Sequence, residues 1–506
     1  MGLAEMMAAK KSPIVLGGFQ PTDEQLEALR LFKTGENIAI EAGAGTGKTS
    51  TLALLANSTT KKGQYIAFNK SIVEDSKSKF PQNIKCSTMH SLAYGAIIPN
   101  SPYKDRLSGN RQRPQDVANF LGLTSFNYTI DGKMKELSAD RLSIIVQNMV
   151  YKFCTSADRE LTKSHFPFVE GIDLPDHWEN HNAMAWYLEP FAQKYWNDVV
   201  DHNGKMQFKH EHYLKLYHLS DPVIKKDFIL FDEAQDASPI MLDIVLKQDC
   251  QLVFVGDANQ AIYAFTGAVN AMEQIPAENK ATLSKSFRFG EKIADTANDV
   301  LSLLGADLKI IGFEKIQSTV TSLDEPKCIL YRTNGGVIGE IIQSLVDGKK
   351  VAYIGDENQI ISFVKACADL KAGKRTMHPE LMCFESWDVL QMFASMNEDD
   401  KSLALMIRLI NQYGAVEIIN AFKKLTTERN ADVIVSTAHK SKGREWDSVK
   451  LGSDFPDEIE NASDEEKRLL YVSATRAKKD LDVSLIPFFG KYYIEECEGD
   501  DEDDEP

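Results

Sequence analysis

A single segment, residues 37–51 (NIAIEAGAGTGKTST), constrains the fold of this chain more than any other. An apolar run predicts a strand that leads into a glycine-rich loop, and the loop leads into a helix beginning near Lys48 and Thr49. Glycines allow a loop to turn its backbone N–H groups around phosphate oxygens, and the helix N-terminus adds the positive end of its dipole. In this pattern the lysine reaches the β- and γ-phosphates of a nucleotide, and the threonine hydroxyl binds Mg²⁺.

The residues predicted to hold the nucleotide phosphates are consecutive: Ala42, Gly43, Ala44, Gly45, Thr46, Gly47, Lys48, Thr49 and Ser50. The general pattern has glycine at the first position, where this chain has Ala42. A glycine-rich turn without a ligand is the alternative, and the order of strand, loop and helix disfavours it.

Two adjacent carboxylates follow another apolar run, Phe228–Phe231. The run predicts a buried strand, and Asp232 and Glu233 stand at its end. Asp232 is placed to hold Mg²⁺, and Glu233 to orient and deprotonate the attacking water in phosphoryl transfer. Adjacent carboxylates can also be a solvated strand end. Their combination with Lys48 favours a site for ATP and Mg²⁺.

Short apolar runs of β type alternate with longer helical patterns along most of the chain. This alternation is typical of α/β layers with buried parallel strands. The expected strands are Asn37–Glu41, Gln64–Phe68, Phe228–Phe231, Gln251–Val255, Cys328–Tyr331, Val351–Ile354 and Asp432–Val435.

Two stretches with mainly helical patterns interrupt the alternation, and we interpret them as insertions into two α/β lobes. The predicted parts are the first lobe (14–95 and 222–283), its insertion (96–221), the second lobe (284–354 and 431–490), its insertion (355–430) and a tail (491–506).

The motif LFDEAQD and the blocks around it resemble the superfamily 1 helicases of the Rep/UvrD type, and most closely the helicase core of the F-box DNA helicases. The matching blocks are, in order, PTDEQ, AGAGTGKT, IAFNKS, STMHSLAYGA, YLKLYHLS, LFDEAQD, VFVGDANQAIYAFTGAVNA, KSFRFG, ILYRTN, STAHKSKGREW and RLLYVSATRAKK. They run from Gln25 to about Ser484, nearly the whole chain. The resemblance implies an α/β fold of two RecA-like P-loop lobes with parallel sheets, each carrying a mainly helical insertion. It also implies an ATP-dependent DNA helicase.

The resemblance assigns three residues to the nucleoside of ATP. Gln25 matches a residue that reads the adenine edge through a bidentate amide contact, Phe287 an aromatic that stacks on adenine, and Glu445 a ribose contact. Gln260, in GDANQ, matches a sensor that lies between the γ-phosphate and the DNA groove.

Arg288 and Arg476 resemble the two arginines that the second lobe directs to the γ-phosphate. A guanidinium group stabilises charge on the transferring phosphoryl group, and arginines from the opposite lobe do so only when the cleft is closed. ATP would then favour closure, and hydrolysis would release it. The alternatives are a surface arginine at a helix start for Arg288 and a solvated helix face for Arg476.

The predicted DNA groove rests on aromatic residues, which stack on bases regardless of base sequence. Tyr263 and Phe265 lie two positions apart and point the same way on an extended segment, although a pair facing the core has the same spacing. Thr266 follows where relatives usually carry arginine, so one phosphate or base contact is expected to be missing. The other residues that match DNA-facing positions are Phe68, Asn69, Thr88, His90 and His439. Either histidine can instead be a hydrogen-bonded core residue.

The segment Lys205–His218, KMQFKHEHYLKLYH, mixes lysine, histidine and aromatic residues. It either lines the DNA path or forms an amphipathic helix, and we predict the helix. The side chains that such a helix would pack are Phe208, Tyr213, Leu214 and Tyr217.

The net charge of −17 has the wrong sign for a protein held on DNA by general electrostatic attraction. Residues 495–506 carry nine acidic side chains and no basic ones, but the remainder of the chain is still acidic. DNA binding therefore needs a defined basic and aromatic groove. The acidic tail is predicted to be disordered and is a candidate contact for a protein partner.

The seven cysteines are scattered, and no pair has the spacing of a zinc knuckle, so we predict reduced, mostly buried thiols. No run of about 18 apolar residues occurs, and residues 1–13 lack the apolar core of a signal peptide. We therefore expect a cytoplasmic or nucleoid-associated protein with no membrane partner.

These residues predict a motor that couples ATP hydrolysis to movement along single-stranded DNA and to unwinding at junctions of single- and double-stranded DNA. The 3′→5′ polarity is implied by the resemblance alone. One alternative is a translocase that strips proteins from single-stranded DNA with little unwinding, and it would share every ATP residue. The other is a catalytically defective P-loop scaffold, which is disfavoured by the intact residues Lys48, Thr49, Asp232, Glu233, Gln260, Arg288 and Arg476.

Overall fold

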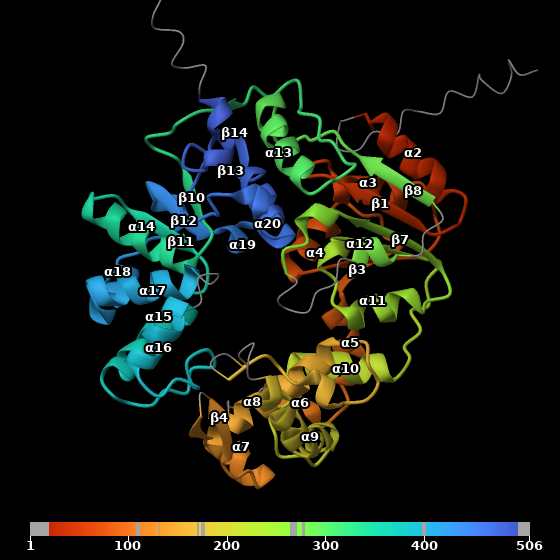
Figure 1. Ribbon diagram of the computed structural model, residues 1–506. Coiled ribbons are helices and arrows are strands. Elements are labelled where there is room, and N and C mark those ends of the chain that lie inside the picture. The colour runs from red at the N-terminus through yellow and green to blue at the C-terminus, as the bar shows by residue number, and fades with distance from the viewer. Residues whose placement is uncertain are drawn as a thin grey trace, which may run out of the picture.

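The computed structural model describes residues 20–107, 112–130, 132–169, 172–173, 178–263, 271–275, 279–396 and 401–493. Its framework is two six-stranded sheets, which lie on the left and right of the upper half of the molecule in Figure 1. Phe265, Thr266 and the acidic run 495–506 lie outside the described residues. The described cysteines form no disulfide, and most are buried: Cys154, Cys328, Cys367 and Cys383.

The first sheet has the strand order β3-β2-β6-β7-β1-β8, and every neighbouring pair is parallel. Its strands are β1 (Ile38–Ala42), β2 (Gly63–Ala67), β3 (Ile84–Thr88), β6 (Phe228–Phe231), β7 (Gln251–Gly256) and β8 (Asn279–Leu283). Helices α2 (Asp23–Phe32) and α3 (Lys48–Asn57) pack on one face, and α11 (Pro239–Leu246) packs on the other. Because the strands are parallel, the loops that follow them gather at one edge of the sheet.

The second sheet has the order β11-β12-β10-β13-β14-β9 and is also parallel throughout. Its strands are β9 (Thr319–Val320), β10 (Cys328–Tyr331), β11 (Val351–Ile354), β12 (Val433–Thr437), β13 (Trp446–Leu451) and β14 (Ala477–Asp482). Helices α13 (Glu291–Leu303) and α20 (Asp464–Ala474) cover one face, and α14 (Asn334–Val346) covers the other. Two covered parallel sheets of this kind confirm the predicted fold class of two RecA-like α/β lobes.

Every expected strand lies in one of these sheets, and β6, β10 and β11 have the predicted bounds. The strands β3, β8, β9, β13 and β14 were not predicted. Polar residues interrupt their apolar runs, as Lys478, Lys479 and Asp480 do within β14. The sequence therefore lacks the apolar pattern that would predict a strand at these places.

The region between β3 and β6 is mainly helical, as expected. Its helices are α5 (Met89–Ile97), α6 (Tyr103–Leu107), α7 (Pro114–Leu121), α8 (Ala139–Thr155), α9 (Trp178–Val200) and α10 (His210–Leu219). It also contains an antiparallel hairpin of β4 (Phe126–Ile130) and β5 (Lys133–Leu137), which the sequence analysis missed. Charged residues occupy most of β5, so the hairpin has a weak apolar signal.

The region between β11 and β12 is helical, with α15 (Glu357–Lys371), α16 (Trp387–Met396), α17 (Lys401–Tyr413) and α18 (Ala415–Lys423). Its core is continuous with α14 and the second sheet. Between α15 and α16, Met382 and Cys383 join the core of the other helical region, so the two regions are in contact. Within the described residues, no single helix has the length and apolar character to cross a membrane. One pair bent by 94°, Ser402–Tyr413 with Ala415–Lys423, qualifies by length and composition alone.

Candidate functional site

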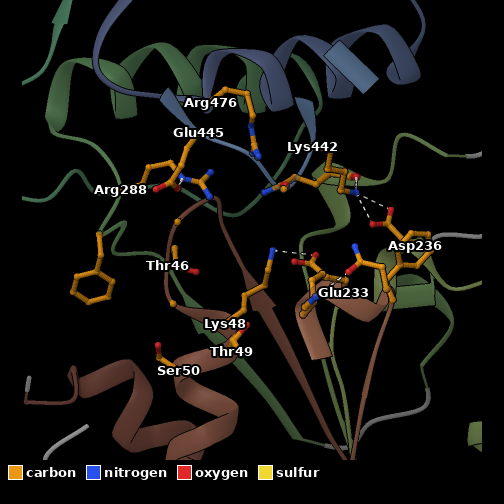
Figure 2. Close-up of a pocket in the computed structure, with 18 of the residues that line it drawn as sticks. Thr46, Lys48, Thr49, Ser50, Glu233, Asp236, Arg288, Lys442, Glu445 and Arg476 are labelled. Carbon is orange, nitrogen blue, oxygen red and sulfur yellow. Dashed lines mark hydrogen bonds and ion pairs between the residues drawn. The ribbon is translucent and has the colours of Figure 1, made fainter. Parts of the chain in front are cut away.

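A pocket of about 400 Å³ lies among the loops that follow the strands of both sheets. Figure 2 shows residues of the first lobe below it and residues of the second lobe above it. Cofactor sites commonly have this size. The predicted site residues that line it are Gly45, Thr46, Gly47, Lys48, Thr49, Ser50, Phe68, Asn69, Glu233, Gln260, Tyr263, Phe287, Arg288, Glu445 and Arg476. Ala42, Gly43 and Ala44 are buried behind this lining.

The loop between β1 and α3 requires glycine at two positions. Gly45 has φ +74° and Gly47 has φ +81°, in the left-handed region that other residues rarely adopt. At Gly45 the space requires glycine too, because a Cβ atom would lie 2.6 Å from Ser286 Oγ and 2.7 Å from Arg288 Cβ. Helix α3 begins at Lys48, and its first N–H groups have no partner within the helix, so they are available to phosphate oxygens.

The two carboxylates at the end of β6 have different partners. Glu233 Oε2 lies 3.4 Å from Lys48 Nζ, and the two side chains point toward each other in Figure 2. Asp232 Oδ2 accepts hydrogen bonds from Thr49 Oγ1 at 3.1 Å and from Tyr65 Oη at 2.7 Å. Tyr65 was not predicted as a site residue, because it belongs to a fully buried strand and only the pairing of β2 with β6 brings it to Asp232.

Glu233 combines an uncommon backbone conformation with nearby positive charges. Its φ of +54° is uncommon for a residue other than glycine. Gln235 Nε2 donates to Glu233 Oε2 at 2.6 Å. Burial would raise the pKa of Glu233, but the positive charges of Lys48 and Lys442 outweigh burial and lower that pKa to about 2. Burial, with the charge of Glu233 added, raises the pKa of Asp232 to about 6.

Arg288 and Arg476 both reach the pocket from the side of the second lobe. Arg288 Nε pairs with Glu445 Oε2 at 2.7 Å, and its Nη1 donates to the carbonyl of Thr475 at 3.0 Å. Arg476 is 1% exposed, and its Nε donates to the carbonyl of Val472 at 2.7 Å. Burial, together with the charge of Arg288, lowers the pKa of Arg476 to about 9. A solvated helix face is therefore wrong for Arg476, and Arg288 is ion-paired rather than a free surface residue.

Gln25 and Phe287 both lie next to Gly47. A Cβ atom built at Gly47 would be 3.5 Å from Gln25 Nε2 and 3.7 Å from the ring of Phe287. Gln25 Nε2 donates to Thr51 Oγ1 at 3.2 Å, and Gln25 Oε1 accepts from the N–H of Thr22 at 3.1 Å. Phe287 is 39% exposed and lines the pocket.

Lys442 and Asp236 join the two lobes on the other side of the pocket. Lys442 Nζ lies 2.6 Å from Asp236 Oδ2 and donates to the carbonyl of Gln260. The two charged side chains are almost fully buried, at 9% and 3% exposure. Both residues belong to motifs that carry the family resemblance, but no role was predicted for either. The sequence signal that could have indicated this ion pair is the opposite charge of the two residues in two separate motifs.

Phe68, Tyr263 and His439 come together where the two lobes meet. The rings of Phe68 and Tyr263 are parallel within 5°, with centroids 6.2 Å apart. Tyr263 Oη donates to the carbonyl of His439 at 3.2 Å. Phe68 is 46% exposed and Tyr263 is half-buried, so neither is a pure core residue. Burial lowers the pKa of His439 to about 4.

Asn69, Thr88 and His90 lie at the carboxyl ends of β2 and β3. Asn69 caps α4 (Lys70–Lys77) and Thr88 caps α5, each by accepting a hydrogen bond from the N–H three residues ahead, at 2.9 and 3.1 Å. His90 packs edge-on against Tyr213, and burial lowers its pKa. Its Nδ1 is buried and has no hydrogen-bond partner within the described residues. At this atom His90 is therefore not the hydrogen-bonded core histidine that was the alternative.

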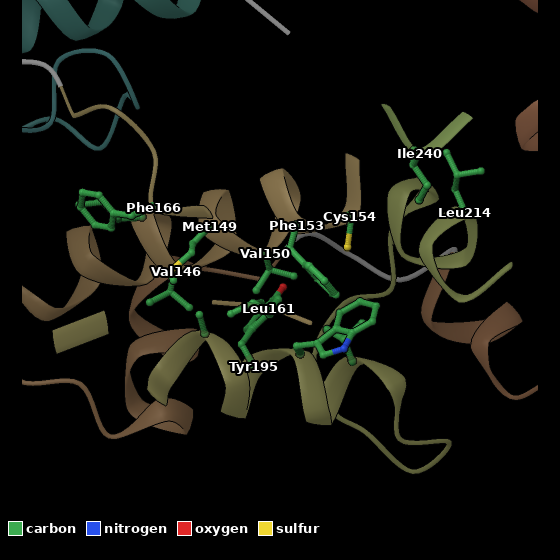
Figure 3. Close-up of a cluster of buried hydrophobic side chains, with 14 of the residues drawn as sticks. Val146, Met149, Val150, Phe153, Cys154, Leu161, Phe166, Tyr195, Leu214 and Ile240 are labelled. Carbon is green, nitrogen blue, oxygen red and sulfur yellow. The ribbon is translucent and has the colours of Figure 1, made fainter. Parts of the chain in front are cut away.

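The segment Lys205–His218 packs into the first helical region as predicted, but its helix, α10, begins only at His210. The apolar residues that were expected to pack are all buried: Phe208, Tyr213, Leu214 and Tyr217. Figure 3 shows Leu214 beside Ile240, next to the side chains that α8 and α9 contribute to the same cluster. Lys215 is fully buried as well, with Nζ 4.0 Å from the ring centre of Phe153, and burial lowers its pKa to about 8.

Two family models match the chain. The model of an AAA domain matches residues 25–266, and the model of the UvrD-like helicase C-terminal domain matches residues 312–487. F-box DNA helicase protein 1 of Schizosaccharomyces pombe is 32% identical over 92% of this chain and 57% of its own length. F-box DNA helicase 1 of Gallus gallus is 27% identical over 94% of this chain and 50% of its own. The ATP-dependent DNA helicase UvrD2 of Mycobacterium tuberculosis is 24% identical over 50% of this chain and 46% of its own. The chain thus spans about half the length of the curated relatives it matches.

Two parallel sheets that share one phosphate-binding pocket are the architecture of a P-loop NTPase with two RecA-like lobes. The first family match covers most of the lobe that carries Lys48, and the second covers most of the lobe that carries Arg476. On these matches, the chain is similar to the UvrD-like helicases over most of both lobes.

Proposed function

We propose that this chain is an ATP-dependent DNA helicase that moves 3′→5′ along single-stranded DNA and unwinds duplex at junctions. The observation that carries the proposal is the pocket in which Lys48 and Glu233 of the first lobe face Arg288 and Arg476 of the second. A nucleotide bound there would contact both lobes, so its hydrolysis would change how the lobes pack against each other. The names of the relatives, which are DNA helicases, support DNA as the track. We also propose that the lobes and their insertions have the residue ranges predicted from the sequence.

The residues present fit ATP and Mg²⁺. Thr49 Oγ1 and Asp232 Oδ2, 3.1 Å apart, are oxygen donors of the kind that Mg²⁺ prefers. Bound Mg²⁺ would supply positive charge to the phosphate oxygens. Lys48 would exchange Glu233 for the β- and γ-phosphates. Glu233 would then lose part of the positive charge that lowers its pKa, and it would orient the attacking water and accept its proton.

The second lobe would complete the site with its arginines. Arg288 would exchange Glu445 for a γ-phosphate oxygen, since this ion pair lines the pocket. Arg476 has a pKa of about 9 and therefore remains a cation at neutral pH despite its burial. Positive charge placed before the reaction begins stabilises the transferring phosphoryl group without reorganisation. This arrangement disfavours the alternative of a catalytically defective scaffold.

The exposed rings at the meeting point of the lobes support single-stranded DNA as the ligand. Phe68 is 46% exposed, and aromatic stacking binds any base. Tyr263 lies parallel to Phe68 and is hydrogen-bonded to the backbone of His439 in the second lobe. A base held at these rings would therefore respond to the relative position of the lobes.

The proposal is tested by measuring ATP hydrolysis with and without single-stranded DNA, beside strand displacement from duplexes with a 3′ or a 5′ tail. We expect ATPase that is stimulated by DNA and unwinding of the 3′-tailed duplex only. Stimulated ATPase with displacement of bound protein but no unwinding would favour the translocase alternative. A chain without ATPase would favour the scaffold, and unwinding of the 5′-tailed duplex would reverse the polarity.

We predict that Phe68→Ala weakens binding of single-stranded DNA by about 1–3 kcal/mol, the usual contribution of one stacked base. ATPase without DNA should fall much less than DNA binding, because Phe68 lies at the edge of the pocket and its ring packs beside Tyr263 rather than on the loop 42–50. Fluorescence anisotropy with a labelled oligonucleotide measures the affinity. Trp186→Ala, which truncates another exposed aromatic on α9, is the control and should bind normally. Equal affinity of Phe68→Ala and wild type would remove Phe68 from the groove.

A further inference from the structure

Tyr471 of α20 inserts its hydroxyl from the second lobe between two groups of the first. Its side chain is fully buried, and its Oη accepts a hydrogen bond from the N–H of Ala44 at 3.1 Å. The same Oη donates to Asp257 Oδ2 at 2.9 Å. Ala44 belongs to the phosphate loop, and Asp257 follows β7. One phenol therefore contacts two separate parts of the nucleotide site.

Asp257 extends this contact to Gln260. Its Oδ2 also accepts from Gln260 Nε2 at 2.7 Å, and its Oδ1 accepts from the N–H of Asn259 at 3.1 Å. The carboxylate thus fixes the short 3₁₀ turn Ala258–Gln260 together with the side-chain amide of Gln260. Because Asp257 is fully buried, water does not replace a partner that is lost.

The backbone of Asp257 connects the same turn to the base. The N–H of Asp257 donates to Gln235 Oε1 at 3.1 Å, and Gln235 Nε2 donates to Glu233 Oε2 at 2.6 Å. A continuous set of hydrogen bonds therefore runs from the hydroxyl of Tyr471 to the carboxylate that faces Lys48. Such networks hold their members in one geometry when every member has its partner.

Lys442 is a second contact of the second lobe with this turn, but it acts on a different atom. It donates to the backbone carbonyl of Gln260 and pairs with Asp236. It does not reach the Gln260 amide. Tyr471, through Asp257, connects the second lobe to the end of the Gln260 side chain.

We propose that Tyr471 is a positioning residue that orients Gln260 and the phosphate loop when the two lobes are closed. The inference rests on the proposed ATPase and goes beyond it by assigning the link between lobe closure and the γ-phosphate sensor to one hydroxyl group. If the lobes separate, the hydroxyl leaves Asp257 and Ala44, and Gln260 loses the fixed carboxylate geometry. Burial keeps the pKa of Tyr471 well above its usual value, so the phenol remains a donor at working pH.

The test is Tyr471→Phe, which removes the hydroxyl and keeps the buried ring. We expect kcat for DNA-stimulated ATP hydrolysis to fall about tenfold, the effect of about 1.4 kcal/mol. The KM for ATP should change little, because Tyr471 does not line the pocket. Tyr331→Phe is the control: this partly buried tyrosine of the same lobe donates to Glu340 Oε2 at 2.8 Å, away from the pocket. It should keep the wild-type kcat.

The outcomes separate this inference from the proposed function. A wild-type chain without ATPase would defeat the proposed function itself. An active wild type with an unchanged kcat in Tyr471→Phe, or an equal loss in Tyr331→Phe, would overturn the inference alone. In a double-mutant cycle with Gln260→Ala, the two losses should be less than additive, and full additivity would also overturn it. If Tyr471→Phe does not fold, Asp257→Ala removes the acceptor of the same link from the other end and should lower kcat without raising KM.

Discussion

Lys48→Ala is expected to lower the ATPase rate at least about 100-fold, the effect of removing a principal electrostatic group from the reacting phosphate. Lys48 Nζ lies 3.4 Å from Glu233 at the start of α3, where it can reach the phosphates. Its loss also leaves the partly buried carboxylate of Glu233 without its nearest counter-charge, so the pKa of Glu233 should rise. Unwinding should disappear with hydrolysis.

Binding of single-stranded DNA by Lys48→Ala should remain largely intact, because the exposed ring of Phe68 does not depend on the lysine. Steady-state ATPase and oligonucleotide anisotropy measure the two effects on the same preparation. Thermal melting controls for folding. Strong ATPase in a folded Lys48→Ala variant would show that this loop does not bind the reacting phosphates.

Glu233→Gln is expected to bind ATP and Mg²⁺ but to hydrolyse ATP about 100- to 10,000-fold more slowly, the range for loss of a general base. Glutamine keeps the size of the side chain, and its carbonyl can still accept the hydrogen bond from Gln235. The oxygen donors Thr49 and Asp232 are unchanged. Because Lys48 loses an ion pair, the affinity for nucleotide should not fall.

Asp232→Asn is the comparison that separates the roles of the two carboxylates. It should lose Mg²⁺-dependent nucleotide binding, which a fluorescent ATP analogue measures at several Mg²⁺ concentrations. It should also disturb the hydrogen bonds from Thr49 and Tyr65. If Glu233→Gln instead loses nucleotide binding as severely as Asp232→Asn, the assignment of base and metal ligand is wrong.

The strands that the sequence predicts are those whose side chains are apolar without interruption, such as Phe228–Phe231. Strand β13 lies inside the second sheet, yet its sequence contains Asp447 and Lys450. Lys450 Nζ is tolerated there because it pairs with Asp482, a fully buried carboxylate of the neighbouring strand, at 3.1 Å. That pairing depends on strand order and register, which no local pattern contains. A strand is therefore missed in the sequence when its polar residues pair with polar residues of a neighbouring strand.

The phosphate loop and the carboxylate pair could be predicted because each lies in one short motif with its own chemistry. The contacts between lobes could not, since Lys442 meets Asp236, and Tyr471 meets Asp257, only in the folded arrangement. Tyr263 illustrates the intermediate case. Its spacing allowed either a core or a DNA-facing position, and the structure gives it a half-buried ring with a hydroxyl bonded across the lobes.

At Gly45 the phosphate loop (residues 42–50) lies so close to the segment that carries Arg288 that the space between them does not hold a methyl group. The two segments are closely packed here, and closely packed atoms transmit a displacement instead of absorbing it. A loop that shifts to accept a phosphate would therefore press directly on Ser286 and Arg288, without an intervening hinge. A side chain at position 45 would push the phosphate loop away from Ser286 and Arg288. A movement of the loop would then no longer be transmitted to that segment.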